Sequence, residues 1–231
     1  MRDHTEKRLQ VRHLGILEYL PVWEAMQRFT NERSSSTLDE IWLLQHPPVF
    51  TQGQAGKSEH LLDTGDIPVI QVDRGGQVTY HGPGQLVAYL LIDLKRAEFG
   101  VRDLVTAIEE LIVKVLSHYK INSGPRKDAP GVYIEPVADG AKIAQLGLRI
   151  RRGCSFHGLS INVDMDMQPF QRINPCGLAG LKVTSIKLQN NAAPTMSDLT
   201  DKLVEAIANE LGYTSQHVIS DGLLPVSPIA V

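Results

Sequence analysis

The amino-acid sequence predicts an α+β fold, a single domain in which a mixed or antiparallel sheet is flanked by helices. The chain has 231 residues, of which 42% are hydrophobic and 21% charged, as in ordinary globular proteins. At this length roughly 70% of the unfolded chain's surface should become buried, so the core needs no disulfide or structural metal. Three amphipathic segments alternate with short β-rich runs, which places helices and strands in one unit.

Three segments have the 3.6-residue periodicity of helices. Val22–Arg33 follows a proline that suits a helix start. The strongest pattern covers Val101–Tyr119 and has Asp103 in its first turn, where a carboxylate is favourable. The third helix is expected between a capping candidate, Ser197, and a terminating Gly212.

Seven short runs rich in β-branched and aromatic residues predict strands. Clusters of proline and glycine interrupt the chain as loops do, and no 20–50-residue repeat is present, so we expect one domain over 1–231. The predicted strands are Ile41–Leu44, Val69–Val72, Leu86–Leu94, Gly131–Ile134, Lys142–Ile150, Ser155–Val163 and Lys182–Leu188.

Charge and hydropathy argue against several classes of partner. Lys and Arg number 23 and Asp and Glu 26, a net charge of -3 that gives no overall attraction to nucleic acid or anionic lipid. The first ten residues lack the apolar segment of a signal peptide, and no stretch approaches the roughly 20 apolar residues that span a bilayer. We therefore expect a cytoplasmic protein with no nucleic-acid or membrane partner.

Motifs for nucleotides and metals are incomplete. Gly53–Ser58 is similar to a phosphate loop, but Thr51 occupies the position of its first glycine. Gly82–Gly84 fails as a dinucleotide fingerprint because Val87 occupies the third glycine position. No histidine pair has the spacing of a zinc motif and neither cysteine has a near partner, so we expect no cofactor and no metal site.

The two cysteines, Cys154 and Cys176, are predicted to be free thiols, too few for a disulfide framework. Cys176 lies in the turn-forming segment Asn174–Gly177, in which a proline and a glycine can present the thiol at a loop tip. Cys154 instead leads into a predicted strand. Cys176 is the better candidate nucleophile, and a buried turn cysteine remains the alternative.

A catalytic thiol needs a nearby cation or base, because a thiol with the reference pKa of about 8.5 is only a few per cent thiolate at neutral pH. Lys142 is a candidate, since its small or apolar neighbours could bury its stem. It lies 34 positions from Cys176, so only the fold could bring them together. An ordinary strand-edge lysine is the alternative.

Arg74–Gln85 is the strongest candidate binding segment. It holds four glycines, a proline and several hydrogen-bonding side chains within twelve residues. Glycines allow a ligand to approach the backbone closely, while the polar side chains can orient it. A glycine-rich connection within the sheet is the alternative.

The same segment opens a series of motifs that closely resembles the lipoyl(octanoyl) transferase family, the octanoyl-[acyl-carrier-protein]-protein N-octanoyltransferases. The resemblance covers about 15–220 and implies a fold like the catalytic domain of biotin and lipoate protein ligases. The motifs are Arg74–Gln85, Asp128–Tyr133, Lys142–Ile143, Leu146–Arg152, Ser155–Leu159 and Arg172–Gly177.

The resemblance implies a Cys/Lys dyad, Cys176 and Lys142, that needs no cofactor. Octanoyl would pass from octanoyl-acyl carrier protein, through a thioester on Cys176, to a lysine of lipoyl domains of 2-oxoacid dehydrogenases or of glycine cleavage H protein. Gln145 and Ser160 depart from the family's commonest residues, Ser or Ala at 145 and Ala at 160. The implied substrate-binding residues are Arg74, Gly75, Gly76, Gln77, Val78, Thr79, Tyr80, His81, Gln145, Leu146, Gly147, Gly158, Leu159 and Ser160.

Three other functions fit part of this pattern. An ATP-dependent lipoate or biotin ligase would share the fold and a lysine but needs no nucleophilic cysteine. A non-enzymatic domain that only binds lipoyl or biotinyl proteins would not depend on Cys176, and an amidotransferase would differ in its acyl donor. Arg149, Arg151 and Arg152 could contact an acidic carrier protein, although arginines at a strand end are commonly just solvated.

Overall fold

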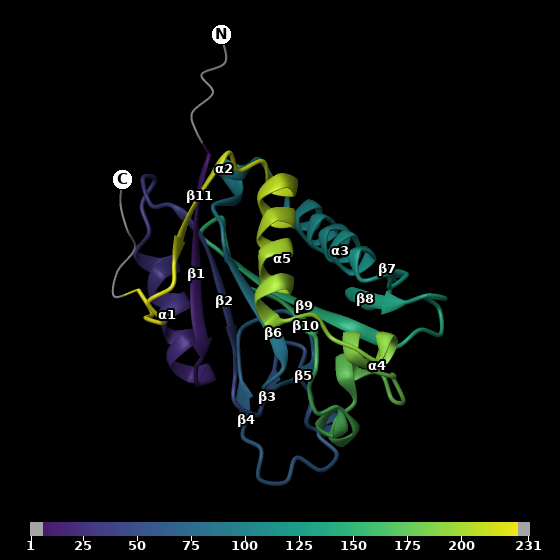
Figure 1. Ribbon diagram of the computed structural model, residues 1–231. Helices are drawn as coiled ribbons and strands as arrows, with labels where there is room; N and C mark the ends of the chain where they lie inside the picture. Colours follow the sequence, from purple (N-terminus) through teal and green to yellow (C-terminus); the bar gives the residue numbers. More distant parts are fainter. Residues whose placement is uncertain (1–6, 226–231) are drawn as a thin grey trace.

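The computed structural model describes residues 7–225, which form one eight-stranded sheet and one three-stranded sheet (Figure 1). The larger sheet has the order β11-β1-β2-β6-β10-β9-β8-β7 and the smaller one β4-β3-β5. The strands are β1 (Arg8–Ile16), β2 (Asp39–Gln45), β3 (Val49–Gln52), β4 (Val69–Gln71), β5 (Val78–His81), β6 (Gln85–Leu91), β7 (Ser123–Pro125), β8 (Gly131–Ile134), β9 (Lys142–Arg151), β10 (Cys154–Asn162) and β11 (Ser215–Ile219).

Both sheets are mixed. In the larger sheet β1 pairs in parallel with β2 and β11, while the remaining neighbours are antiparallel. In the smaller sheet β3 is parallel to β4 and antiparallel to β5. The helices are α1 (Tyr19–Glu32), α2 (Leu94–Ala97), α3 (Val101–His118), α4 (Ile186–Asn190) and α5 (Met196–Leu211), with single 3-10 turns η1 (Ser58–His60), η2 (Gln168–Arg172) and η3 (Pro175–Gly177).

Helices cover the larger sheet on its two faces. The long helices α3 and α5 lie side by side on one face, where Ile108 and Leu203 join the main core (Figure 1). On the other face α1 packs Met26 and Phe29 against Trp42 of β2 in a second core. Burial of these apolar faces is the main favourable term in folding.

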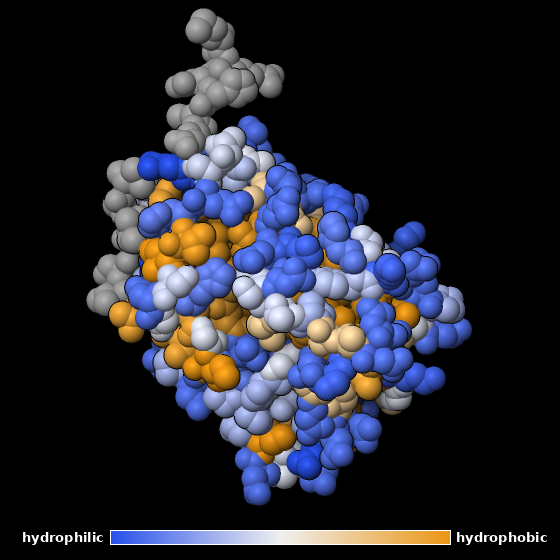
Figure 2. Space-filling model, in the orientation of Figure 1, coloured by the Kyte–Doolittle hydropathy of each residue, from blue (hydrophilic) through white to orange (hydrophobic). Residues whose placement is uncertain are grey.

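The surface over α3 and α5 is largely hydrophilic, as amphipathic helices require (Figure 2). Hydrophobic side chains are more frequent near β1, α1 and β11, where Ile16, Leu20 and Val218 are exposed. Within residues 7–225 no helix combines the length and apolar character needed to cross a membrane.

The three predicted helices are confirmed, with one correction at a cap. The Val101–Tyr119 pattern matches α3, and α1 begins at Tyr19, before the predicted start. In α5 the N-cap is Thr195, whose side chain accepts from the Asp198 backbone N–H, so Ser197 lies inside the helix. Gly212 ends α5 in a left-handed conformation, as expected of glycine there.

The predicted strand Lys182–Leu188 is wrong. Only Val183 makes an isolated bridge, to Lys142, and Ser185 then caps α4 by accepting from the Leu188 backbone N–H. The other six predicted strands each overlap an observed one, although β6 ends at Leu91, before the predicted end at Leu94. Strands β1, β3, β5, β7 and β11 were not predicted.

Candidate active site

The fold brings Cys176 and Lys142 together. Lys142 Nζ donates to Cys176 Sγ at 2.9 Å and to the Pro130 carbonyl at 2.7 Å. Lys142 opens β9 and is only 1% exposed, whereas Cys176 is half-buried in η3. A buried ammonium with two hydrogen-bond partners can stabilise a thiolate through a charge-assisted bond.

Local backbone geometry presents the thiol. Cys176 has a φ of 58°, in the left-handed region that is unfavourable for residues with a side chain, and Gly177 follows with a φ of 74°. The segment after the turn returns to β9, because the Lys142 N–H donates to the Lys182 carbonyl at 2.8 Å and the Thr184 N–H to the Lys142 carbonyl at 2.9 Å. Strained backbone of this kind is concentrated at functional sites.

Gly131 leaves space for the lysine. A Cβ atom at Gly131 would lie 2.4 Å from Lys142 Cε, so a larger residue would displace the side chain. The Gly131 N–H donates to Glu109 Oε1 at 2.8 Å. Burial raises the pKa of Glu109, while this hydrogen bond and the Lys142 charge oppose the rise. A carboxyl group therefore borders the buried ammonium.

Cys176 and Lys142 line a cavity of about 460 Å³. Every residue predicted to contact substrate lines it except Tyr80. The apolar part of the wall includes Val87, Val101, Val105, Leu146, Leu148 and Ile150. A cavity of this size, mostly apolar with a few polar groups, is typical of small-molecule sites.

Tyr80 points away from the cavity. Side chains alternate along a strand, so Thr79 and His81 of β5 face the cavity and Tyr80 faces the opposite side. There its ring packs 5.5 Å from Phe50 and 5.5 Å from Phe170, measured between ring centroids. The structure therefore places the Tyr80 side chain between Phe50 and Phe170 and not at the cavity, where substrate contact was expected.

Arg74 holds the binding loop in shape. Its Nη1 donates to the Gly75 carbonyl at 2.9 Å, and its Nη2 donates to Thr51 Oγ1 at 2.9 Å. The Gly75 N–H in turn donates to the Leu148 carbonyl of β9 at 2.9 Å. Arg74 therefore binds the glycine-rich segment to the smaller sheet, and Gly75 binds it to the larger one, at the wall of the cavity.

The structure adds residues that the sequence reasoning missed, among them Tyr19, Tyr89 and His157 on the cavity wall. His157 Nε2 lies 3.0 Å from Asp73 Oδ1, which also accepts from Trp23 Nε1 at 2.8 Å. Burial lowers the pKa of His157, although the Asp73 hydrogen bond opposes this. Burial acts to raise the pKa of Asp73, but the hydrogen bonds from His157 and Trp23 outweigh it and lower the pKa.

His157 lies inside the matched motif Ser155–Leu159, which is the one signal that could have identified it. Tyr19 and Tyr89 had no such signal, because each falls in a segment that reads as an ordinary helix or strand. Their place at the cavity depends on the packing of α1 against the larger sheet, in the core that also contains Tyr89.

Known proteins match both the sequence and the fold. The sequence-family model described as the lipoyl protein ligase A/B catalytic domain matches residues 18–208 of this chain. An octanoyltransferase of Pseudomonas fluorescens (strain SBW25) is 58% identical over 93% of this chain and 98% of its own length. One from Shewanella loihica is 60% identical over 91% of this chain and 93% of its own.

Solved structures share the fold at low sequence identity. A bipartite lipoate protein ligase from Thermoplasma acidophilum aligns with a TM-score of 0.67 at 16% identity, covering 95% of this chain and 89% of its own. A biotin protein ligase from Aquifex aeolicus aligns with a TM-score of 0.56 at 12% identity, covering 88% and 70%. The predicted fold class and family resemblance are thus confirmed, and the chain belongs to the lipoyl protein ligase A/B catalytic domain family, alongside relatives that are octanoyltransferases.

Proposed function

We propose that this chain transfers an octanoyl group from acyl carrier protein, through a thioester on Cys176, to a lysine of lipoyl domains. Octanoyl transfer is the activity for which the relatives at 58% and 60% identity are named. The observation that carries the proposed route is the 2.9 Å contact between Lys142 Nζ and Cys176 Sγ at the wall of the cavity.

In the first step the thiolate of Cys176 attacks the carbonyl carbon of the donor thioester. The new C–S bond forms to Cys176, and the C–S bond to the carrier breaks. Lys142 takes the thiol proton at the start and returns it to the departing carrier thiolate. The exchange converts one thioester into another, so it requires no external energy source.

In the second step the neutral amine of the acceptor lysine attacks the octanoyl thioester. A C–N bond forms, the C–S bond to Cys176 breaks, and the amine proton passes through Lys142 to the cysteine sulfur. The product is an amide, which is more stable than a thioester, so the transfer proceeds without ATP. This distinguishes it from the ligase reaction of proteins with the same fold.

The cavity suits a medium-length apolar chain. Burial of each methylene contributes about 0.8 kcal/mol, so an octanoyl chain could gain several kcal/mol from the apolar wall. Shorter chains would gain less, because they bury fewer methylenes against the wall of the cavity. Chain length is therefore read from how far the acyl group fills the cavity.

The remaining expectations concern partners and organisation. The relatives are named octanoyltransferases and the matching family is that of the lipoyl protein ligase A/B catalytic domain, which supports lipoyl-domain proteins as acceptors. Arg151 is exposed, while Arg149 donates to Gln54 Oε1 at 3.1 Å and Arg152 to the Asn31 carbonyl, so only part of this arginine group is free for an acidic carrier. We expect one catalytic domain, with its core at about 15–220, in the reducing cytoplasm where a reactive thiol persists.

Intact-protein mass spectrometry tests the route. Wild-type protein mixed with octanoyl-acyl carrier protein should gain one octanoyl group, the Cys176→Ser variant none, and an apo lipoyl domain should discharge the adduct. No adduct, or an adduct on Cys154, would exclude the route. Pyrophosphate release that depends on ATP and octanoate would instead favour the ligase. A function without catalysis would be favoured if wild type and Cys176→Ser bound lipoyl domains equally well and neither protein transferred octanoyl.

A further inference from the structure

Gln145 lies beside the cysteine–lysine pair. It is directly opposite Gly131 in the β8–β9 pairing, and directly paired residues project from the same face of a sheet, about 5 Å apart. A Cβ atom at Gly131 would lie 2.9 Å from Lys142 Nζ. The side chain of Gln145 therefore projects toward the side that carries the ammonium, which itself contacts Cys176.

Ser160 fixes the orientation of this amide. Ser160 is the partner of Gln145 across β9 and β10, and its hydroxyl donates to Gln145 Oε1 at 2.7 Å. The contact directs the amide nitrogen away from Ser160. Gln145 is only 7% exposed, and its Nε2 atom is buried without a hydrogen-bond partner among the described residues. Both Gln145 and Ser160 line the cavity, so a ligand could reach this nitrogen.

A buried donor without a partner is destabilising, and an acceptor on a ligand would restore the missing hydrogen bond. The methylene chain of an octanoyl group has no acceptor. Its carbonyl oxygen has one, and that oxygen must lie next to Cys176 for transfer to occur. The unpartnered donor and the only acceptor of the acyl group are thus in the same part of the cavity.

We propose that Gln145 Nε2 donates a hydrogen bond to the carbonyl oxygen of the acyl group, and that Ser160 is the positioning residue that holds the amide. This inference rests on the proposed function. When the thiolate attacks, an electron pair of the carbonyl moves to this oxygen, and the amide stabilises the charge without giving up a proton. Collapse of the oxyanion then expels the carrier thiolate, which takes its proton from Lys142.

The amide would act beside Cys176 and Lys142, which already supply the nucleophile and the proton transfers of the proposed route. We therefore expect Gln145 to increase the rate by a moderate factor, on top of an existing site.

Single-turnover acylation by octanoyl-acyl carrier protein tests this role. Gln145→Met keeps a long unbranched side chain and removes the donor, so the maximal rate of Cys176 acylation should fall about 10- to 100-fold. The half-saturating donor concentration should change less than about twofold, because the interaction strengthens in the transition state. Ser160→Ala frees the amide to rotate and should reduce the rate less than Gln145→Met.

Infrared difference spectra of the acyl-enzyme supply a second readout. With a ¹³C-labelled carbonyl, wild-type octanoyl-Cys176 should absorb at a lower frequency than the Gln145→Met acyl-enzyme, because a hydrogen bond weakens the C=O bond. Equal frequencies together with equal rates would overturn the role of Gln145 while leaving the thioester route intact. Failure of the wild type to form any adduct on Cys176 would instead overturn the proposed function.

Discussion

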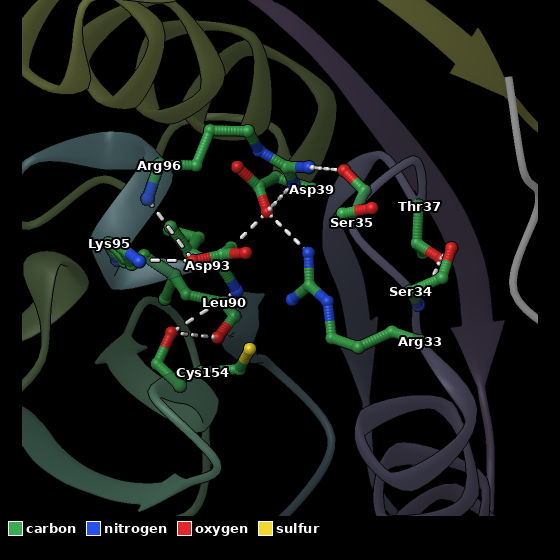
Figure 3. Close-up of polar contacts among 12 residues, drawn as sticks. Arg33, Ser34, Ser35, Thr37, Asp39, Leu90, Asp93, Lys95, Arg96 and Cys154 are labelled. Atoms are coloured by element: carbon green, nitrogen blue, oxygen red, sulfur yellow. Dashed lines mark hydrogen bonds and ion pairs between the residues drawn. The ribbon is translucent and has the colours of Figure 1, made fainter.

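The two cysteines occupy opposite kinds of environment. Cys176 lies in a strained turn, half-buried, with Lys142 Nζ 2.9 Å from its sulfur. Cys154 is 5% exposed at the start of β10, about 20 Å along that strand from Ser160. Figure 3 shows it beside a group of charged residues that includes Arg33, Asp39 and Arg96.

Ion pairs to Asp39 hold the charged group near Cys154 together. Asp39 Oδ1 accepts from Arg33 at 2.6 Å and from Arg96 at 2.6 Å (Figure 3). Burial raises the pKa of Cys154, and this effect exceeds the lowering caused by the Arg33 charge. A cation near a thiol is therefore insufficient for activation. It has to be directed at the sulfur, as the Lys142 ammonium is.

The largest expected difference is in the response to losing each thiol. Cys176→Ser should reduce octanoyl transfer to a lipoyl domain on the order of 10³-fold or more, because the nucleophile is lost. Cys154→Ala should change the rate less than about threefold, because a buried cysteine of this kind acts as a small hydrophobe. Comparable losses in the two variants would contradict the assignment of the nucleophile.

Next in size is the effect of the lysine. Lys142→Ala should lower the transfer rate about 10²- to 10⁴-fold, because both proton transfers and the thiolate's partner are lost. Alkylation of Cys176 by iodoacetamide at neutral pH should slow in the same variant. Lys187→Ala, which removes an exposed lysine paired with Asp164, is the matched control and should leave both rates unchanged.

The charged group near Cys154 should matter for stability instead. Asp39→Asn leaves Arg33, whose side chain is 4% exposed, as an uncompensated buried charge, so the free energy of unfolding should fall by about 3–5 kcal/mol. The exposed pair of Asp164 and Lys187 gives the control, and Asp164→Asn should cost less than about 1 kcal/mol. Urea unfolding measures both. A comparable change in the two variants would show that Asp39 is not a structural centre.

Below its unfolding transition, the Asp39→Asn variant should retain wild-type octanoyl transfer. Asp39 begins β2, at the end of that strand opposite Gln45, whose side chain accepts from the Gly84 N–H near the cavity. A large loss of transfer in folded protein would couple the two regions and would break the comparison between them.

The sequence predicted local features well and long-range contacts poorly. The periodicity of α3 and α5 reports one apolar face, which is a property of neighbouring residues, so both helices were predictable. The strands β3 and β5 are too short to show a clear alternation of apolar and polar residues. The strand predicted at Lys182–Leu188 was wrong because Ser185 caps a helix there, despite the apolar content of the segment.

The candidate site shows the same difference between local features, which were predictable, and long-range contacts, which were not. Proline and glycine around Cys176 indicate a turn from local sequence alone. Nothing local pairs Lys142 with Cys176, because that contact depends on the bridge between β9 and the chain after the turn. The hydrogen bond between Gln145 and Ser160 likewise exists only through strand register, so residue types alone could not predict it.

The smallest expected effect concerns two buried histidines on the cavity side of the sheet. Burial lowers the pKa of His46 to about 4 and that of His81 to about 3. In the unfolded chain each binds a proton below its usual pKa of about 6.5, whereas the folded protein does not until far lower pH. The stabilising contribution is therefore complete above about pH 6.5 and is lost as the pH falls toward 4.

Each of these histidines should reduce the free energy of unfolding by about 1.4 kcal/mol per pH unit within that window. Urea unfolding at pH 7 and pH 5.5 measures the slope. His46→Gln, which keeps a polar group near the Leu17 carbonyl and the Tyr89 hydroxyl, should remove about half of the contribution from the pair. If His46→Gln leaves the slope of the free energy of unfolding against pH unchanged, His46 gains a proton in the folded state as easily as in the unfolded chain. The cavity side of the sheet would then be more hydrated than the surroundings of Cys154.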